Sequence, residues 1–428
     1  MKYISLNHNS SPTSFKKAVI NGLAPDKGLY FPEEKVKLSK SFIESIKNID
    51  DTEICYEIIR EFIGDEIPKN KLLEIINNTI SFKIPLKKIE KSIYSLELFH
   101  GPTLAFKDIG AKFMASCLDF FKDSYTSKKI TVLVATSGDT GGAVANGFLG
   151  AKGVNVVILY PSGKVSNVQE KQLTTLGQNI TALEVDGVFD DCQEMVKTAF
   201  LDEGIKRTLT SANSINIARW LPQMFYFFFA YKELQKTNKE LVFSVPSGNF
   251  GNICAGIMAQ KLGLPIKHFV ASTNINDTVP NYLVDGIYNP KPSKATISNA
   301  MDVGNPSNFI RIRELFNNDL DALKSTFSSH SFSDEETRET MKKIYGDSGY
   351  VADPHGAVGY LGLKKYGLKA NEFGVFLETA HPVKFLDVVE ETLPVKVAIP
   401  AQIQKVINNK KVAIKASSYE DLKAFLMK

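Results

Sequence analysis

Lys107 is the side chain best placed for covalent chemistry in this sequence of 428 residues. It ends a Pro-Thr turn within Leu98–Asp108, and the apolar residues of Ile109–Phe121 then follow with the spacing of a helix. A lysine charge is costly to bury, whereas a neutral amine in an apolar site is a good nucleophile for a carbonyl cofactor. Lys107 is therefore a candidate for a Schiff base. The alternative is a lysine at a helix start with its ammonium in water.

A glycine-rich turn, Ser247–Asn252, stands between an apolar run, Leu241–Val245, and a helical pattern, Ile253–Leu262. In a strand–turn–helix unit, the free N–H groups at the helix start can bind a phosphate. The turn contains no Gly-Lys-Ser/Thr and the chain no Gly-x-Gly-x-x-Gly, so we expect one monoester phosphate and not a nucleotide. An ordinary tight turn is the alternative interpretation.

A second glycine-rich turn, Thr136–Gly142, lies between the apolar run Ile130–Ala135 and a helical pattern, Ala143–Leu149. Two anion-binding turns in one chain suggest two negative groups, such as a cofactor phosphate and a substrate carboxylate. A third feature is Thr379, which follows the apolar run Phe373–Leu377. A hydroxyl at the end of a buried strand can meet a heterocyclic nitrogen, although threonine is also common at strand ends.

Together these segments resemble those of threonine synthase, a family of pyridoxal-phosphate enzymes with the tryptophan-synthase-β fold. The resemblance covers nearly the whole chain in the same order. Its segments are 14–33, 98–108, 136–142, 213–216, 247–252 and 378–384. The first two are the most specific, because cysteine synthases and threonine deaminases share the other motif types but not these.

The resemblance implies conversion of O-phospho-L-homoserine and water to L-threonine and phosphate, with pyridoxal 5'-phosphate bound to Lys107 as a Schiff base. Once released, Lys107 would remove the α-proton of the substrate. Thr379 would hydrogen-bond the pyridine nitrogen. The cofactor phosphate would bind to Gly248, Asn249, Phe250, Gly251 and Asn252. The substrate carboxylate would bind to Ser137, Gly138, Asp139 and Thr140, and the substrate phosphate to Asn216 and Arg219.

Two of these positions carry an open question. Within the fold type, many enzymes have asparagine where this chain has Asp139, and an ionised aspartate cannot donate a hydrogen bond to the phenolate oxygen of the cofactor. Either Asp139 turns away, or another group contacts that oxygen. Arg219 suits a phosphate through its planar fork of donors, and its alternative is an arginine on a helix surface.

Two rival functions share most of these features. A related phospho-lyase would release phosphate and give 2-oxobutyrate through the same early steps. A catalytically silent binding protein on the same fold is the second rival, and Lys107 together with the intact turn Ser247–Asn252 argues against it.

Composition excludes several other classes of protein. The net charge of +4 comes from 51 basic and 47 acidic residues, which argues against nucleic acid as a partner. Four scattered cysteines without a CxxC pair favour reduced thiols and disfavour a metal site. The run Trp220–Tyr231 is too short to span a bilayer, so we predict a buried helix there. We expect a cytoplasmic monomer or small homo-oligomer without a signal peptide.

The elements that must position these residues alternate between strand and helix patterns, which predicts parallel sheets with crossover helices. The predicted strands are 93–99, 130–135, 154–160, 180–185, 241–245, 266–271 and 374–377. The predicted helices include 42–49, 52–63, 71–80, 109–121, 143–150, 166–176, 189–201, 253–262 and 306–316.

The family fold gives these elements an arrangement. It is the α/β architecture of PLP-dependent fold type II, with two open, mostly parallel sheets, helices on both faces and a helical N-terminal region. The expected domains are an N-terminal helical region (1–92), a large cofactor-binding domain (93–126 and 205–428, with an irregular insertion at 273–332) and a small mobile domain (127–204). The cofactor should lie between the two sheets, at the carboxyl ends of the strands.

Overall fold

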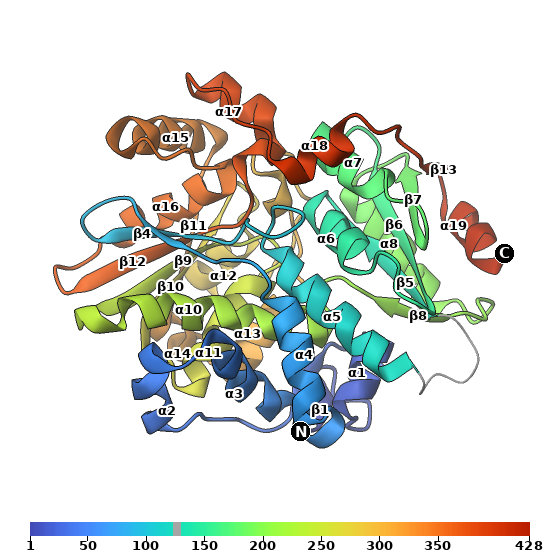
Figure 1. The fold of residues 1–428 in the computed structure, drawn as a ribbon, viewed down its shortest axis with the longest axis horizontal. Helices are drawn as coiled ribbons and strands as arrows, with labels where there is room; N and C mark the ends of the chain where they lie inside the picture. The colour runs from blue at the N-terminus through green and yellow to red at the C-terminus, as the bar shows by residue number, and fades with distance from the viewer. Residues whose placement is uncertain (123–129) are drawn as a thin grey trace.

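Two open β-sheets organise the chain, whose computed structural model describes residues 1–122 and 130–428 (Figure 1). The larger sheet has the strand order β11-β10-β9-β12-β4-β3, in which β3 alone is antiparallel to its neighbour. Its strands are β3 (Leu86–Lys88), β4 (Ile93–Glu97), β9 (Glu240–Pro246), β10 (Ile266–Thr273), β11 (Phe327–Ser331) and β12 (Glu372–Glu378). The result is the predicted α/β arrangement with a mostly parallel sheet.

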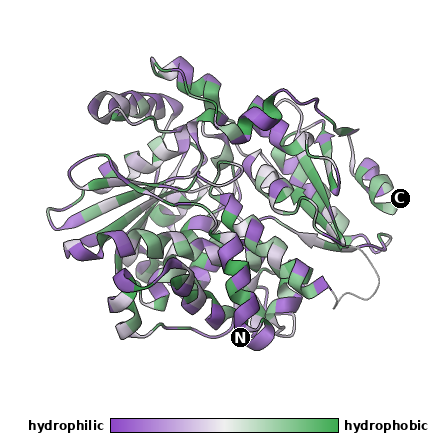
Figure 2. Ribbon diagram, in the orientation of Figure 1, coloured by the Kyte–Doolittle hydropathy of each residue, from purple (hydrophilic) through white to green (hydrophobic). Residues whose placement is uncertain are grey.

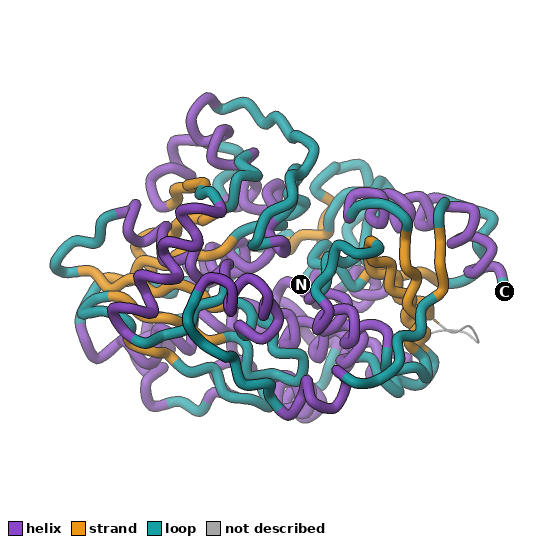
Figure 3. Tube along the Cα trace, turned by 90° about the horizontal axis from the view of Figure 1, so that it is seen from above, coloured by secondary structure: helices purple, strands orange, loops and turns teal. Residues whose placement is uncertain are grey.

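The smaller sheet has five parallel strands in the order β13-β7-β6-β5-β8. They are β5 (Ile130–Ala135), β6 (Val154–Pro161), β7 (Ile180–Val185), β8 (Thr208–Ser211) and β13 (Ile414–Ala416). Seen from above, the strands of the two sheets form separate groups on opposite sides of the molecule (Figure 3). The loops that follow the carboxyl ends of the strands in both sheets lie between the two sheets.

Helices cover both faces of each sheet (Figure 1). Those of the first half of the chain are α1 (Phe15–Asn21), α2 (Lys40–Ser45), α3 (Asp51–Ile63), α4 (Lys69–Thr79), α5 (Lys107–Phe121), α6 (Asp139–Gly147), α7 (Asn167–Thr174) and α8 (Phe189–Leu201). Those of the second half are α9 (Ile217–Trp220), α10 (Met224–Leu234), α11 (Gly251–Leu262), α12 (Thr278–Asp285), α13 (Phe309–Leu315), α14 (Leu320–Thr326), α15 (Asp334–Ser348), α16 (Pro354–Tyr366), α17 (Leu386–Thr392), α18 (Ala401–Ile407) and α19 (Tyr419–Met427). In the larger sheet, α16 packs on β9, β10 and β12, and α11 packs on β10.

Hydropathy follows this layering. Figure 2 shows the outer helix α15 as largely hydrophilic and the strands of the smaller sheet as largely hydrophobic. Strand β5 is buried along its whole length, as expected for a parallel strand covered by helices on both faces. Continuous apolar runs of this kind are the reason that the strand positions could be predicted from the sequence.

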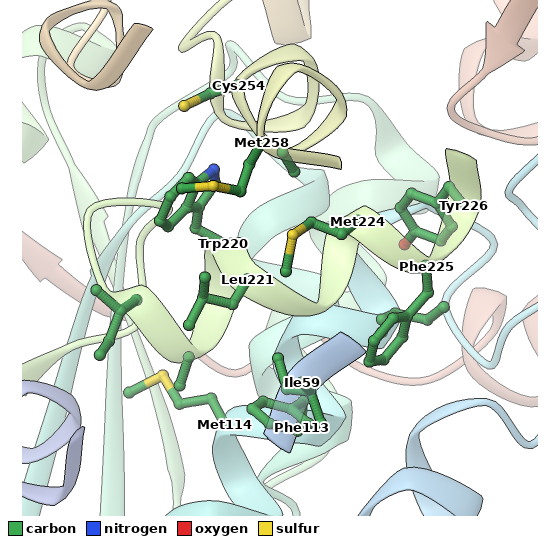
Figure 4. Packing of buried hydrophobic residues seen from close by; sticks show 14 of the residues in the cluster. Ile59, Phe113, Met114, Trp220, Leu221, Met224, Phe225, Tyr226, Cys254 and Met258 are labelled. Atoms are coloured by element: carbon green, nitrogen blue, oxygen red, sulfur yellow. The ribbon is translucent and has the colours of Figure 1, made fainter. Parts of the chain in front are cut away.

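The predicted buried helix at 220–231 is confirmed as the end of α9 together with α10, joined by a short 3-10 turn. Trp220 and Met224 pack against α5, α3 and α11, through Phe113, Ile59 and Met258 among others (Figure 4). Each large apolar side chain removed from water contributes about 1.5–3 kcal/mol. Among the described residues, no helix is both long enough and apolar enough to cross a membrane.

Parts of the expected organisation differ from the structure. The N-terminal region also contains a two-stranded antiparallel sheet, β1 (Tyr3–Ser5) with β2 (Tyr30–Pro32). The segment 273–332 is not an irregular insertion throughout, because its strand β11 forms the edge of the larger sheet. Strands β1 and β2 of three residues and the largely polar strand β11 of five residues carry too little apolar pattern to be recognised before their partners are known.

The smaller sheet also draws on more of the chain than 127–204. It takes β8 and β13 from outside that range, so the expected small domain is too narrow as a description of the sheet. The expected boundary between 126 and 127 lies outside the described residues. The division into domains, and the mobility of the smaller one, therefore stay predictions.

Candidate active site

A cavity lies between the two sheets, with an empty volume of about 820 Å³ that includes its opening to solvent. Its wall is built where β5, β9 and β12 end and where α5, α6 and α11 begin. Most of the predicted site residues line it: Lys107, Ser137, Asp139, Thr140, Arg219, Gly248, Asn249, Phe250, Gly251, Asn252 and Thr379. Segments that are far apart in the sequence thus converge at one site, as the parallel topology requires.

Lys107 is the first residue of α5 and is held in place by the end of β12. The Phe106 N–H donates to the carbonyl of Thr379 (2.9 Å), and Ala105 pairs with Ala380 in an isolated β-bridge. Burial, together with the nearby cations Lys384 and Arg219, lowers the pKa of Lys107 to about 8, and the carboxylate of Asp139 opposes this shift. The amine is therefore far more often neutral than that of an ordinary lysine.

The turn after β9 presents backbone N–H groups to the cavity. Phe250 has a left-handed backbone (φ 61°) and caps α11, whose first N–H groups have no partner inside the helix. The side chain of Asn249 accepts from Ser307 N–H (3.0 Å), and that of Asn252 donates to the Pro246 carbonyl (2.8 Å). Both amides thus hold the turn and leave its backbone free to bind an anion.

A glycine is required at position 248 because the backbone of Ala300 and Met301 packs closely against the turn. A Cβ atom at this position would lie 2.8 Å from the Met301 Cα and 2.9 Å from the Ala300 carbonyl oxygen. Neither of these backbone atoms can move as the end of a flexible side chain does. Any larger residue would therefore displace the turn or the segment that packs on it.

The turn after β5 is shaped by Thr136. Its Oγ1 accepts from Gly138 N–H (2.9 Å) and from Gly141 N–H (2.8 Å). Gly138 has a φ of 131°, and a Cβ there would lie 2.3 Å from the Gln169 side chain. Its N–H is already used and it does not line the cavity, so the prediction that Gly138 contacts the substrate is not supported. Its role is to form the turn.

Asp139 begins α6 and is buried, with 3% of its side chain exposed. Lys384 Nζ lies 2.6 Å from its Oδ1, and Gln169 Nε2 donates to the same oxygen (2.9 Å). Although burial opposes ionisation, Lys384 and Lys107 hold the pKa of Asp139 well below its usual range. The carboxylate is thus ionised and already paired, which answers in part the question raised by an aspartate at this position.

Thr379 directly follows β12 and lines the cavity with a neutral hydroxyl-bearing side chain. The preceding residue, Glu378, accepts from Asp353 N–H (2.6 Å) on the opposite face of the strand. Burial raises the pKa of Glu378 well above its usual value, and the nearby Asp353 adds to the shift. A heterocyclic nitrogen here would consequently meet a hydroxyl and not a carboxylate.

Arg219 lines the cavity, whereas Asn216 does not. The Asn216 amide donates to the Val19 carbonyl (2.8 Å), and its oxygen accepts from Ala218 N–H (3.0 Å) as the N-cap of α9. The structure thus removes Asn216 from the candidate site, because its side chain is already used within the fold. Arg219 Nη1 donates to the Ala212 carbonyl (2.7 Å), and no carboxylate within the described residues forms an ion pair with it.

Several cavity residues were not predicted from the sequence. Ser214 accepts from the Asn308 amide (2.9 Å) beside the turn at Gly251. His355 Nδ1 lies 2.7 Å from Asp353, and its Nε2 accepts from Ala300 N–H (3.1 Å). These contacts require a neutral imidazole with its proton on Nδ1, and they fix the segment that packs on Gly248. No local pattern in the sequence marks such residues as part of the site, because the contacts of Ser214 with Asn308 and of His355 with Ala300 join segments that are distant along the chain.

Comparison with known proteins identifies the family. The family model for pyridoxal-phosphate dependent enzymes matches residues 75–375, and the model for the threonine synthase N terminus matches residues 2–80. Threonine synthase from Buchnera aphidicola subsp. Acyrthosiphon pisum is 47% identical over 413 residues, which is 95% of each chain. The chain belongs to the threonine synthase family.

Solved structures agree with this assignment. The crystal structure of threonine synthase from Escherichia coli has a TM-score of 0.95 at 44% identity, and the match covers 100% of this chain and 99% of that one. PLP-bound threonine synthase from Brucella melitensis has a TM-score of 0.92 at 33% identity, with 100% and 98% covered. The predictions of fold type II, of a PLP-dependent lyase and of pyridoxal 5'-phosphate as the cofactor are confirmed.

Proposed function

We propose that this chain converts O-phospho-L-homoserine and water to L-threonine and phosphate, as a cytoplasmic enzyme of threonine biosynthesis. One observation carries the proposal beyond family membership. A lysine amine with a lowered pKa and an arginine that forms no ion pair with the described residues share a cavity with two helix starts. That set of groups suits a substrate with a carboxylate, an amine and a phosphate.

The residues present fit pyridoxal 5'-phosphate. The glycine-rich turn after β9 lines the cavity, and the start of α11 offers N–H groups without a helical partner to a phosphate. Thr379 offers a neutral hydroxyl to the pyridine nitrogen, and Lys107 offers its amine to the aldehyde carbon. When bound, the cofactor supplies an electron sink for the carbanion formed at the substrate Cα.

The proposed roles of the remaining residues follow from their positions. Lys107, once its amine is free, takes the proton from the substrate Cα, because it is held beside that atom. The N–H groups of Ser137, Asp139 and Thr140 bind the substrate carboxylate at the start of α6. Arg219 holds the substrate phosphate and orients it until it leaves. A proton must also leave Cβ, so that the C–O bond at Cγ breaks and phosphate departs with the electron pair. A proton is then added at Cγ, the oxygen of water adds at Cβ, and a proton returns to Cα.

Product analysis with purified protein tests this function directly. Incubation with O-phospho-L-homoserine should give L-threonine and phosphate in equal amounts, measured by amino-acid chromatography and a phosphate assay. Phosphate with 2-oxobutyrate and ammonia would instead identify the related phospho-lyase. Phosphate release with neither product would contradict both functions.

Replacement of Gly248 by alanine should weaken retention of the cofactor. The added Cβ meets the backbone of Met301 and Ala300, so the turn must shift, and several hydrogen bonds to the phosphate of about 1.5–3 kcal/mol each lengthen. Cofactor content after gel filtration, read from visible absorption, measures the loss. Gly346→Ala is the matched control, because no atom of the described residues lies within 4 Å of a Cβ at that position. Equal cofactor content in the two variants would count against this site.

The lowered pKa of Lys107 predicts a characteristic pH dependence in the cofactor-free protein. With a pKa of about 8, roughly half of its amine is neutral at that pH, whereas less than about 1% of an ordinary lysine is neutral. Trinitrophenylation of the Lys107 peptide should therefore rise with pH around a midpoint near 8. The reference is N-acetyl-lysine amide under the same conditions. A midpoint that coincides with the reference would show that the cavity does not activate this amine.

A further inference from the structure

Lys384 and Asp139 connect the two sheets beside the cavity. Lys384 lies in a 3-10 turn, Pro382–Phe385, that follows β12 of the larger sheet, and Asp139 begins α6 after β5 of the smaller one. The Nζ–Oδ1 distance is 2.6 Å, and the two side chains are 0% and 3% exposed. In the described part of the chain, no other lysine or arginine forms an ion pair in which both partners are so deeply buried.

Lys384 does not itself face the cavity. Its Nζ also donates to the Thr103 carbonyl (3.0 Å), which accepts a second hydrogen bond from Gln172 Nε2 (3.1 Å). Asp139, in contrast, lines the cavity and receives the Gln169 amide on the oxygen that faces Lys384. Lys384 is thus held away from any ligand and acts on the cavity through its charge, which pairs with Asp139 and also lowers the pKa of Lys107.

An aspartate at the start of α6 poses an electrostatic problem for an anionic ligand. The helix start attracts negative charge, and the carboxylate of Asp139 occupies that position already. A second carboxylate bound to the N–H groups of the same turn would be repelled, strongly so in a site that excludes water. The repulsion is removed only if another group cancels the charge of Asp139.

We propose that Lys384 is a positioning residue whose charge neutralises Asp139 and so allows the start of α6 to bind the carboxylate of an amino acid. The proposal rests on the proposed function and deepens it, since it assigns the determinant of carboxylate recognition. It also explains why an aspartate is compatible with this turn. Without neutralisation of Asp139, the glycine-rich turn Thr136–Gly142 would not bind an anion.

Binding of two matched probes to the holoenzyme tests the proposal. L-2-aminobutyrate and its carboxamide differ at the carboxyl group alone, which is charged in the first and a neutral amide in the second, and calorimetry gives a dissociation constant for each. Lys384→Met should weaken binding of the carboxylate probe by roughly tenfold or more, the scale of a like-charge contact in a partly buried site. Binding of the carboxamide should change little, and Asp139→Asn combined with Lys384→Met should recover the preference for the carboxylate.

A surface pair supplies the control. Lys396→Met breaks a pair with Glu390 at 2.5 Å in which the lysine is 88% exposed, and it should leave both dissociation constants unchanged. Equal losses for the two probes in Lys384→Met, or no recovery in the double variant, would overturn the proposal. If Lys384→Met does not fold, Asp139→Asn decides, because it should bind the carboxylate at least as tightly as the wild type. Threonine formation is measured separately, so failure of the proposed function is distinguishable from failure of this inference.

Discussion

Replacement of Lys107 by alanine is expected to abolish turnover of O-phospho-L-homoserine and to leave a protein without the yellow colour of bound cofactor. No amine then remains to hold the cofactor covalently, and no base remains beside the substrate Cα. Loss of a positioned base alone costs about 10²–10⁴-fold in rate, and loss of the covalent anchor adds to it. Threonine formation and visible absorption of the purified variant measure both effects.

Lys112→Ala is the matched control, because Lys112 belongs to the same helix and donates to Ser81 Oγ (2.6 Å) on the outside of the protein. That variant should stay yellow and active. In the wild type, borohydride should fix the cofactor to a single peptide that contains Lys107. A label on another lysine, or undiminished activity of Lys107→Ala, would show that the anchor has been misassigned.

The large elements of this fold could be predicted because they are buried on a regular pattern. The strands Ile130–Ala135 and Ile180–Val185 and the helix Phe189–Leu201 have the bounds that their apolar spacing indicates. Parallel strands covered on both faces read as continuous apolar runs, and crossover helices between them keep a period near 3.6 residues. The glycine-rich turns could be located for the same reason, since each stands between two such elements.

Short strands and side-chain roles could not be predicted in the same way. Strand β13 (Ile414–Ala416) exists only through pairing with β7, more than two hundred residues earlier in the chain. Asn216 has the chemistry of a phosphate ligand, yet its amide is consumed by carbonyls at Val19 and Ser211. Which hydrogen bonds a polar side chain makes depends on partners that are distant in sequence, so residue type alone does not decide its role.

The burial of Lys384 could have been predicted from its neighbours in the sequence. It stands in Pro382-Val-Lys-Phe-Leu386, an apolar context like that of Lys107, and a lysine in such a context needs either covalent use or a buried partner. The structure supplies the partner in Asp139. The aspartate at the start of α6 and the lysine without an assigned role are thus two parts of one feature.

Replacement of Arg219 by leucine is expected to lower the specificity constant for O-phospho-L-homoserine by 30-fold to several thousand-fold, which corresponds to about 2–5 kcal/mol for a lost charge-assisted contact with a dianionic phosphate. Arg219 is buried and lines the cavity, and burial lowers its pKa to about 10, so the guanidinium stays charged at neutral pH. Its Nε has no hydrogen-bond partner within the described residues but is buried against Gly110, so a ligand would have to use the terminal N–H groups of the guanidinium.

The comparison that decides this prediction uses two substrates. Slow side reactions with L-serine should change far less in Arg219→Leu, because serine has no phosphate for the guanidinium to hold. Arg219 also donates to the carbonyls of Ala212 and Lys107, so it could serve mainly to support the Lys107 segment. Equal losses for the two substrates would assign it that structural role. The fluorescence of Trp220 is a poor measure of whether a ligand occupies the cavity. The indole ring packs on Phe31 in the core (centroids 5.8 Å apart) and does not line the cavity.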